Sequence, residues 1–157
     1  MGVRASRGVG LLCAAVLLAG CGEPDWGSDQ HGQPVAAAQL DGRWLVINYW
    51  AEWCGPCRKE VPELNRLADE SAGQPLRVLG VNFDGLQGEE LRKAVEALGI
   101  RYTSLARDPA PRLGLTPSPV LPVTWLVDPQ GRVREQLTGE QTAAGLKAKL
   151  AALATPR

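Results

Sequence analysis

Several features that mark other protein classes are scarce in this chain. It has one histidine, His31, and its 17 basic residues balance its 17 acidic ones. This balance gives no support for a nucleic-acid partner or another strongly charged one. The apolar run at residues 9–20 is shorter than the roughly 20 residues that a membrane-spanning helix needs. The chain also has no internal repeat and no low-complexity tail, so its 157 residues, 45% of them hydrophobic, are expected to form one domain with a real core.

The four cysteines differ in what surrounds them. Residues 1–20 are typical of a secretory signal peptide, because basic residues precede an apolar core that contains Cys13. Cys13 would be removed with that peptide. The stretch ends in LAGC, which places small residues directly before Cys21. This sequence resembles the bacterial lipobox, where a peptidase cuts before a cysteine that carries diacylglycerol and often a third acyl chain.

Two or three acyl chains anchor a protein stably, whereas one binds a membrane marginally. We therefore expect an exported bacterial lipoprotein that is tethered through Cys21 and faces the periplasm, or the outer face of the cytoplasmic membrane. Gly22 is not the aspartate that commonly retains lipoproteins at the inner membrane, so the outer membrane is an alternative. The other interpretation is a plain signal peptide that leaves Cys21 as a free thiol.

The remaining pair, Cys54 and Cys57, stands two residues apart in the sequence WCGPC. It follows an apolar run at 44–50 that is typical of a buried strand. It precedes residues 58–72, whose apolar side chains fall on one helical face. The dithiol is therefore predicted to lie at a strand-to-helix junction.

The residues between the cysteines suit such a junction. Gly55 allows a tight turn beside the sulfurs, and Pro56 fits the first helical turn, where a missing N–H costs nothing. The partial positive charge of a helix N-terminus stabilises a thiolate at Cys54. The pattern predicts thiol–disulfide exchange, with Cys54 as the attacking sulfur and Cys57 as the resolving one.

Two other roles for this pair are less well supported. A structural disulfide across so short a loop would contribute only about 2 kcal/mol. A zinc site takes about four ligands, and His31 is the only histidine. We therefore expect no metal and no cofactor beyond the redox-active Cys54–Cys57 disulfide itself.

The run VINYWAEWCGPCRKEVP at 46–62 resembles the thioredoxin superfamily, in its membrane-anchored TlpA/ResA-type (DsbE-like) bacterial branch. The resemblance covers most of the chain from about Gly32. It implies an α/β, thioredoxin-like fold with a mixed central sheet and helices on both faces. It also implies exported protein substrates with disulfides and a membrane-embedded electron donor of the DsbD/CcdA type. One branch of the family serves apocytochrome c maturation.

The segment LPVTWLVD at 121–128 resembles the part of this family that carries a cis-proline. Pro122 is favoured over Pro117 and Pro119, because a strand pattern starts directly after it. A cis bond there would turn a backbone edge toward the dithiol, where an extended substrate can pair with it. The residues expected to face the substrate are Trp53, Gly55, Pro56 and Leu121.

Glu60 is the candidate for proton transfer at the dithiol. Asn48 stands six residues before Cys54, where thioredoxins proper carry a buried aspartate, and an amide cannot exchange a proton near neutral pH. Glu60 lies one turn after Cys57 and matches the acidic residue that TlpA/ResA-type proteins hold close to the dithiol. Burial would raise its pKa and suit it to proton traffic. The alternative is a solvated helix glutamate.

Periodicity and turn residues predict the other elements. Polar residues 21–33 are expected to be a tether, or a shortened first hairpin opened by Pro24-Asp25-Trp26, ahead of a domain at 34–157. Further strands are expected at 33–39 (weak), 76–83, 102–106, 123–127 and 132–137. Further helices are expected at 89–98 and 139–153, with one helical turn around Arg112 in a loop at 108–119. Alternating strands and helices predict an α/β sandwich around a mixed sheet.

The leading hypothesis is a membrane-tethered, monomeric oxidoreductase that reduces disulfides in exported proteins. Gly-Pro between the cysteines and Leu121 before Pro122 favour a reductant. A dithiol oxidase or isomerase is the alternative within the same chemistry. A copper-chaperone-like binding module of the Sco kind would need a CxxxC spacing and a late histidine, and a peroxidase of the peroxiredoxin type a Thr-x-x-Cys setting. This chain has neither.

Overall fold

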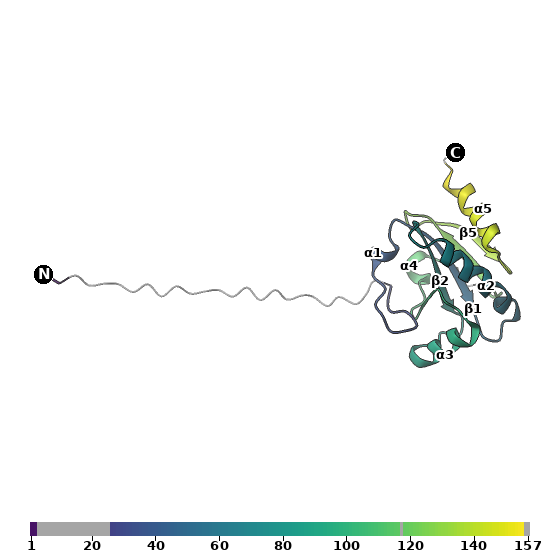
Figure 1. Ribbon diagram of the computed structural model, residues 1–157, viewed down its shortest axis with the longest axis horizontal. Helices are drawn as coiled ribbons and strands as arrows, with labels where there is room; N and C mark the ends of the chain where they lie inside the picture. The colour runs from purple at the N-terminus through teal and green to yellow at the C-terminus, as the bar shows by residue number, and fades with distance from the viewer. Residues whose placement is uncertain (3–25, 117, 156–157) are drawn as a thin grey trace.

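The computed structural model describes residues 1–2, 26–116 and 118–155. Its five strands form one sheet in the order β3-β2-β1-β4-β5 (Figure 1). The strands are β1 (Trp44–Trp50), β2 (Leu76–Asn82), β3 (Thr103–Leu105), β4 (Val123–Val127) and β5 (Val133–Thr138). β1, β2 and β3 run parallel, β4 is antiparallel to β1, and β5 is antiparallel to β4. The mixed sheet and its helices form the thioredoxin-like fold that the resemblance implies.

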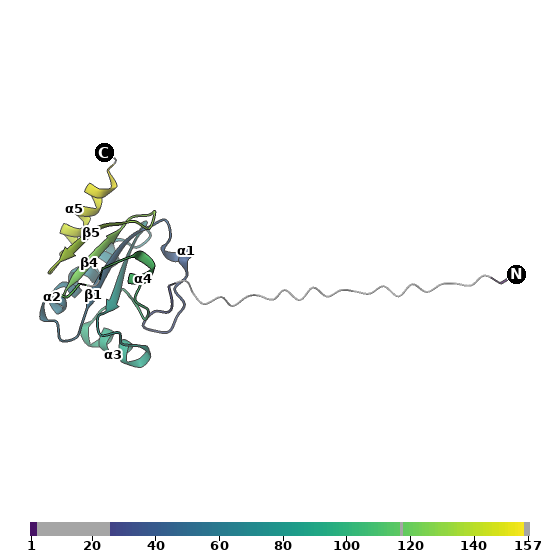
Figure 2. The same cartoon turned by 180° about the vertical axis from the view of Figure 1, so that it is seen from behind.

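Helices cover both faces of the sheet, as Figures 1 and 2 show from opposite sides. The helices are α1 (Ala37–Leu40), α2 (Gly55–Glu70), α3 (Gly88–Leu98), α4 (Ala110–Leu113) and α5 (Ala143–Ala154). Apolar residues of α2, α3 and α5 pack with Val46 and Trp50 in one core. The opposite face packs Ile47 and Tyr49 against α1, α4 and the N-terminal segment. Successive residues of β1 thus serve the two cores alternately, as the pleat of a strand requires.

The N-terminal segment from Trp26 is part of the domain. The backbone N–H of Trp26 donates to Val35 O at 3.2 Å, and that of Val35 donates to Gly27 O at 2.9 Å. The Trp26 side chain is buried in the second core. Residues 26–33 therefore agree with the predicted alternative of a shortened first hairpin rather than with a tether. Cys21 and Pro24 lie outside the described residues.

Two predicted elements differ from the structure. Residues 33–39 form a single bridge at Pro34 and then the short helix α1, where Gln39 Oε1 accepts the N–H of Ala36. Alanine favours a helix over a strand, and this local propensity decides the outcome here. The last helix begins at Ala143 instead of residue 139, because Thr142 Oγ1 caps it by accepting the N–H of Gly145 at 3.1 Å.

The bounds of the other predicted strands and helices differ from the observed ones by at most three residues, and those of the strands at 44–50 and 123–127 are the same. Among residues 26–116 and 118–155, no helix has both the length and the apolar character that crossing a bilayer takes.

Candidate active site

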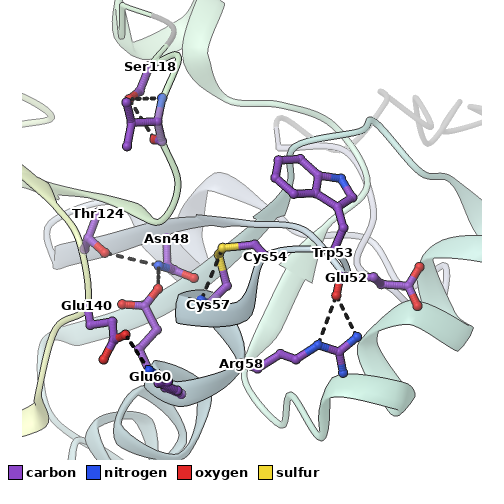
Figure 3. The surroundings of a disulfide bond; sticks show 12 residues. Asn48, Glu52, Trp53, Cys54, Cys57, Arg58, Glu60, Ser118, Thr124 and Glu140 are labelled. Atoms are coloured by element: carbon purple, nitrogen blue, oxygen red, sulfur yellow. Dashed lines mark hydrogen bonds and ion pairs between the residues drawn. A yellow bond between two sulfur atoms is a disulfide. The ribbon is translucent and has the colours of Figure 1, made fainter.

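Cys54 and Cys57 form a disulfide at the start of α2, with their Cα atoms 5.3 Å apart. Cys54 is the N-cap of the helix, and its Sγ accepts the backbone N–H of Cys57 at 3.2 Å (Figure 3). Cys54 keeps 4% of its surface exposed, whereas Cys57 keeps none. Of the two sulfurs, Cys54 is therefore the one that a reactant can approach. The N–H of Cys57 and the partial positive charge at the N-terminus of α2 would also stabilise a negative charge on Cys54 Sγ.

The surface beside the disulfide carries little side-chain bulk. Gly55 and Pro56 are exposed in the first turn of α2. Apart from its two chain neighbours and the backbone of its own helix, no atom of the described residues lies within 4 Å of the position that a Cβ on Gly55 would take. Another polypeptide can therefore come close to the backbone at this point.

The Leu121–Pro122 peptide bond is cis, which confirms the bond geometry predicted for this proline. In the antiparallel pairing of β1 with β4, Val123 lies opposite Tyr49. This register brings Pro122 to the end of the sheet where β1 leads into the dithiol. Pro122 is buried and its carbonyl accepts the N–H of Gly139 at 2.9 Å, while Leu121 is half-buried.

Glu60 is buried inside the protein, with only 2% of its surface exposed. One carboxylate oxygen accepts from Asn48 Nδ2 at 2.6 Å, and the other accepts the backbone N–H of Gln141 at 3.0 Å. Burial raises the pKa of Glu60 to about 7, although these two hydrogen bonds act in the opposite direction. The alternative of a solvated glutamate is wrong. Figure 3 shows the carboxylate directed toward Asn48, on the side of α2 that faces the sheet.

Asn48 joins Glu60 to two further polar side chains. Its Nδ2 also donates to Thr124 Oγ1 at 3.2 Å, and the hydroxyl of Tyr102 donates to its Oδ1 at 3.5 Å. Burial, with a smaller effect of the Glu60 charge, raises the pKa of Tyr102, which therefore stays protonated near neutral pH. The four side chains form one buried network beneath the disulfide, and Glu60 is its member that titrates near pH 7.

Sequence reasoning identified Asn48 and Glu60 but missed Thr124, Tyr102 and Gln141. Thr124 is the pairing partner of Asn48 in the register of β4 on β1. It was visible as the one polar residue in the apolar strand VTWLV. Tyr102 is 54 residues from Asn48, and Gln141 contributes only its backbone, so neither gives a sequence signal.

Trp53 lies at the surface with 66% of its area exposed. Its indole Nε1–H donates to Asp84 Oδ2 at 3.0 Å, and its ring meets Phe83 edge-on with the centroids 6.1 Å apart. Trp53 therefore connects the dithiol to the loop that follows β2. Among the described residues, no group of three histidine, cysteine, aspartate or glutamate side chains gathers as a metal site would.

Comparison with known proteins agrees with this geometry. The AhpC/TSA family matches residues 22–136. The thiol-disulfide oxidoreductase ResA of Geobacillus thermodenitrificans is 28% identical over 123 residues, which are 78% of this chain and 70% of that protein. The thiol:disulfide interchange protein HelX of Rhodobacter capsulatus is 32% identical over 111 residues, 69% of this chain and 60% of that protein.

The chain also resembles solved structures. The crystal structure of a DsbF homologue from Corynebacterium diphtheriae superposes with a TM-score of 0.67 at 28% identity, covering 80% of this chain and 82% of that one. Fold, dithiol and sequence similarity lead to one conclusion. The chain belongs to the AhpC/TSA family, and it carries the family's thioredoxin-like fold with a dithiol at the start of α2.

Proposed function

We propose that this protein is a membrane-tethered thiol–disulfide oxidoreductase that reduces disulfides in exported proteins. The observation that carries the proposal is the Cys54–Cys57 disulfide at the N-terminus of α2, at the same end of the sheet as the cis Leu121–Pro122 bond. The names of the ResA and HelX relatives support the same chemistry.

The reaction starts from the reduced dithiol. The thiolate of Cys54 attacks one sulfur of a substrate disulfide, so a mixed disulfide forms and one substrate thiolate leaves. The thiolate of Cys57 then attacks Cys54 Sγ, which closes the intramolecular disulfide and releases the second substrate thiol. Two electrons pass from the protein dithiol to the substrate. An electron donor has to reduce Cys54–Cys57 again, and the family resemblance suggests a membrane-embedded thiol transporter of the DsbD/CcdA type.

Glu60 is proposed to receive the proton that Cys57 loses in the second step. It lies one helical turn after Cys57 on α2 and is buried beneath the dithiol. Because its pKa is about 7, both of its protonation states are accessible at neutral pH. Asn48 and Gln141 hold the carboxylate in place through their hydrogen bonds.

The lipid anchor is the second part of the proposal. Between Cys21 and Trp26, the first residue seen packed in the domain, the chain advances by five residues. Five residues span at most about 18 Å when fully extended. A domain attached through acyl chains on Cys21 would therefore stay close to the membrane surface, within reach of a membrane-embedded donor.

Trapping of substrates tests the proposed exchange. The variant Cys57→Ser should accumulate mixed disulfides between Cys54 and exported proteins, because the resolving thiol is missing. The matched variant Cys54→Ser should form none and should lose exchange activity. Non-reducing gels followed by mass spectrometry read out both. If the two variants trap equally well, or only Cys54→Ser traps, the assigned roles are wrong.

A further inference from the structure

A cavity of about 190 Å³ lies on the face of the sheet opposite α2. Most of its wall is apolar and comes from three sources, namely β1 and β4, the loop after β2, and α4 with the loop that follows it. These wall residues are Tyr49, Phe83, Ala110, Leu115, Val123 and Trp125. None of them belongs to the buried network around Glu60, so the reaction described above leaves this cavity without a role.

The cavity adjoins the dithiol through the loops on its two sides. Phe83 lines it and meets the ring of Trp53, the residue directly before Cys54. Val123 lines it and directly follows the cis-proline Pro122. In Figure 3 the loop that carries Ser118, which also lines the cavity, runs past the disulfide on the side away from Glu60. A substrate joined to Cys54 as a mixed disulfide has to lie next to these loops, and therefore next to the cavity.

The surface around the dithiol also exposes large apolar side chains. In the described part of the chain beyond Met1, the large hydrophobic residues that are exposed are Trp53, Phe83 and Val120. Trp53 and Phe83 lie on one side of the dithiol, and Val120 lies in the loop that leads to the cis-proline. Apolar surface gathered at one place marks an interaction site. Here it continues directly into the cavity through Phe83.

The volume of the cavity limits what it can hold. Pockets for whole small-molecule ligands measure roughly 300 Å³ or more. A cavity of about 150 Å³ takes up a single benzene ring. A volume of about 190 Å³ therefore fits one aromatic ring with a small substituent, which is the size of one side chain.

One polar group of the cavity lacks a partner. Asn82 lines the wall with 6% of its surface exposed, and its Oδ1 accepts the N–H of Leu86. Its Nδ2 has no hydrogen-bond partner within the part of the chain that the structure describes. Buried donors are rarely left unpaired in native proteins. The Nδ2 atom is itself closed off from solvent, so a group in the cavity would reach it only after the Asn82 side chain turned.

We propose that this cavity is a specificity pocket that takes one aromatic side chain, such as that of tyrosine, from the polypeptide whose disulfide reacts at Cys54. The inference rests on the proposed exchange function and adds a preference among substrates. The aromatic ring packs against the apolar wall of the cavity. The substrate residue concerned lies within a few positions of the reacting cysteine, because Phe83 and Val123 both adjoin the dithiol.

Reduction of synthetic peptide disulfides tests the pocket. In one set of peptides, tyrosine stands in turn at each of the three positions on either side of the cysteine, and a second set has alanine there. With the full reduced domain, at least one tyrosine position should raise kcat/KM about tenfold or more over its alanine counterpart. Oxidised glutathione, which carries no aromatic ring, serves as the substrate for basal exchange.

The variants Thr116→Phe and Ala110→Leu fill the cavity from two different walls. Each should abolish the tyrosine preference while leaving the rate with oxidised glutathione unchanged. Thr155→Phe is the matched control, because Thr155 ends α5 away from this cavity, and it should keep the preference.

Equal rates of reduction of the tyrosine and alanine peptides by the wild-type protein would contradict the proposed pocket. A tyrosine preference that survives in both Thr116→Phe and Ala110→Leu, when these variants are folded, would contradict it as well. Failure to reduce even oxidised glutathione would instead count against the proposed function, so the two outcomes are distinguishable.

Discussion

At the scale of single residues, proton transfer in the exchange site depends on how the buried carboxylate of Glu60 is held by neutral hydrogen-bond donors. Glu60 receives hydrogen bonds from an amide side chain and a backbone N–H, which are both neutral donors. Hydrogen bonds from neutral donors offset only part of the free-energy cost of burying the ionised carboxylate. The pKa of the Glu60 carboxyl therefore rises to about 7. A lysine or arginine in the place of Asn48 would lower that pKa and keep the group ionised. The neutral partner is therefore what suits Glu60 to proton transfer.

Replacing the carboxyl group tests this role. Glu60→Gln should slow exchange at least roughly tenfold, which is less than the roughly hundredfold at which the usual range for general acid–base catalysis begins. The variant should also lose the inflection near pH 7 in the rate of disulfide exchange, since an amide does not titrate there. Stopped-flow kinetics between pH 5 and pH 9 measures both effects. Equal rates and an unchanged pH profile would reduce Glu60 to a structural residue.

The same group should make stability depend on pH. The folded protein holds a proton on Glu60 more tightly than the unfolded chain, where the pKa is near 4.5. The stabilisation is therefore fully present below about pH 4.5 and is lost as the pH rises through about 7. The free energy of unfolding attributable to this group should fall by an amount on the order of 3 kcal/mol across that window.

Urea denaturation of the oxidised protein at pH 5 and pH 8 measures this fall. Glu60→Gln alters the absolute stability, because an amide cannot accept from Asn48 and Gln141 with both of its polar atoms. Its unfolding free energy should nevertheless lack the part of the pH dependence that comes from Glu60. A variant with the same slope as the wild type would show that Glu60 is not the titrating group.

At the scale of elements, strand β2 is packed too tightly for any side chain at Gly80. A Cβ there would lie 2.7 Å from Ser104 Oγ and 2.9 Å from Trp50 Nε1. Gly80 also pairs with Asn48 of β1 and with Ser104 of β3, so the strand cannot move aside without disturbing the buried network. The close approach of the neighbouring side chains to this strand therefore requires glycine.

Gly80→Ala should lower the free energy of unfolding by about 1–3 kcal/mol, the usual cost of overpacking a core. Gly55→Ala is the matched control, because in the described part of the chain its added methyl group would meet no atom within 4 Å beyond its chain neighbours and its own helix backbone. It should leave stability nearly unchanged. Urea denaturation of both variants provides the measurement. Equal unfolding free energies for the two would contradict the packing argument.

Elements with a strong local pattern could be predicted from the sequence. The apolar run VTWLV gave strand β4 with the correct ends, and WCGPC placed the dithiol at the start of α2. The predictions that failed, at residues 33–39 and at the start of α5, concern stretches where alanine or a capping threonine decides the structure locally. The contacts of the buried network could not be predicted from the sequence. The contact of Tyr102 with Asn48, for example, depends on strand order and register, which periodicity does not encode.

At the scale of the whole molecule, the fold places the dithiol and the cis-proline together at the end of the sheet where β1 leads into α2. The packed N-terminal segment starts at Trp26 on the face opposite α2. A short link from Cys21, if this residue carries the proposed lipid, would keep the domain close to the membrane.

The lipid anchor can be tested on the exported protein. Mass spectrometry of the purified protein should show a mature N-terminus at Cys21 with acyl chains attached. Cys21→Ser should shift the protein from the membrane fraction to the soluble periplasmic fraction if it is still processed, or leave the signal peptide in place. An unmodified N-terminus in the wild type would exclude the lipoprotein assignment.

The central claim is that the dithiol works as a reductant, and its reduction potential tests this most directly. Equilibration of the purified domain with glutathione or dithiothreitol buffers, with alkylation of Cys54 and Cys57 as the readout, gives the value. We expect a potential more negative than about −200 mV, towards the value of about −270 mV for thioredoxin. A potential near the value of about −120 mV for DsbA would instead identify a dithiol oxidase and contradict the proposed direction.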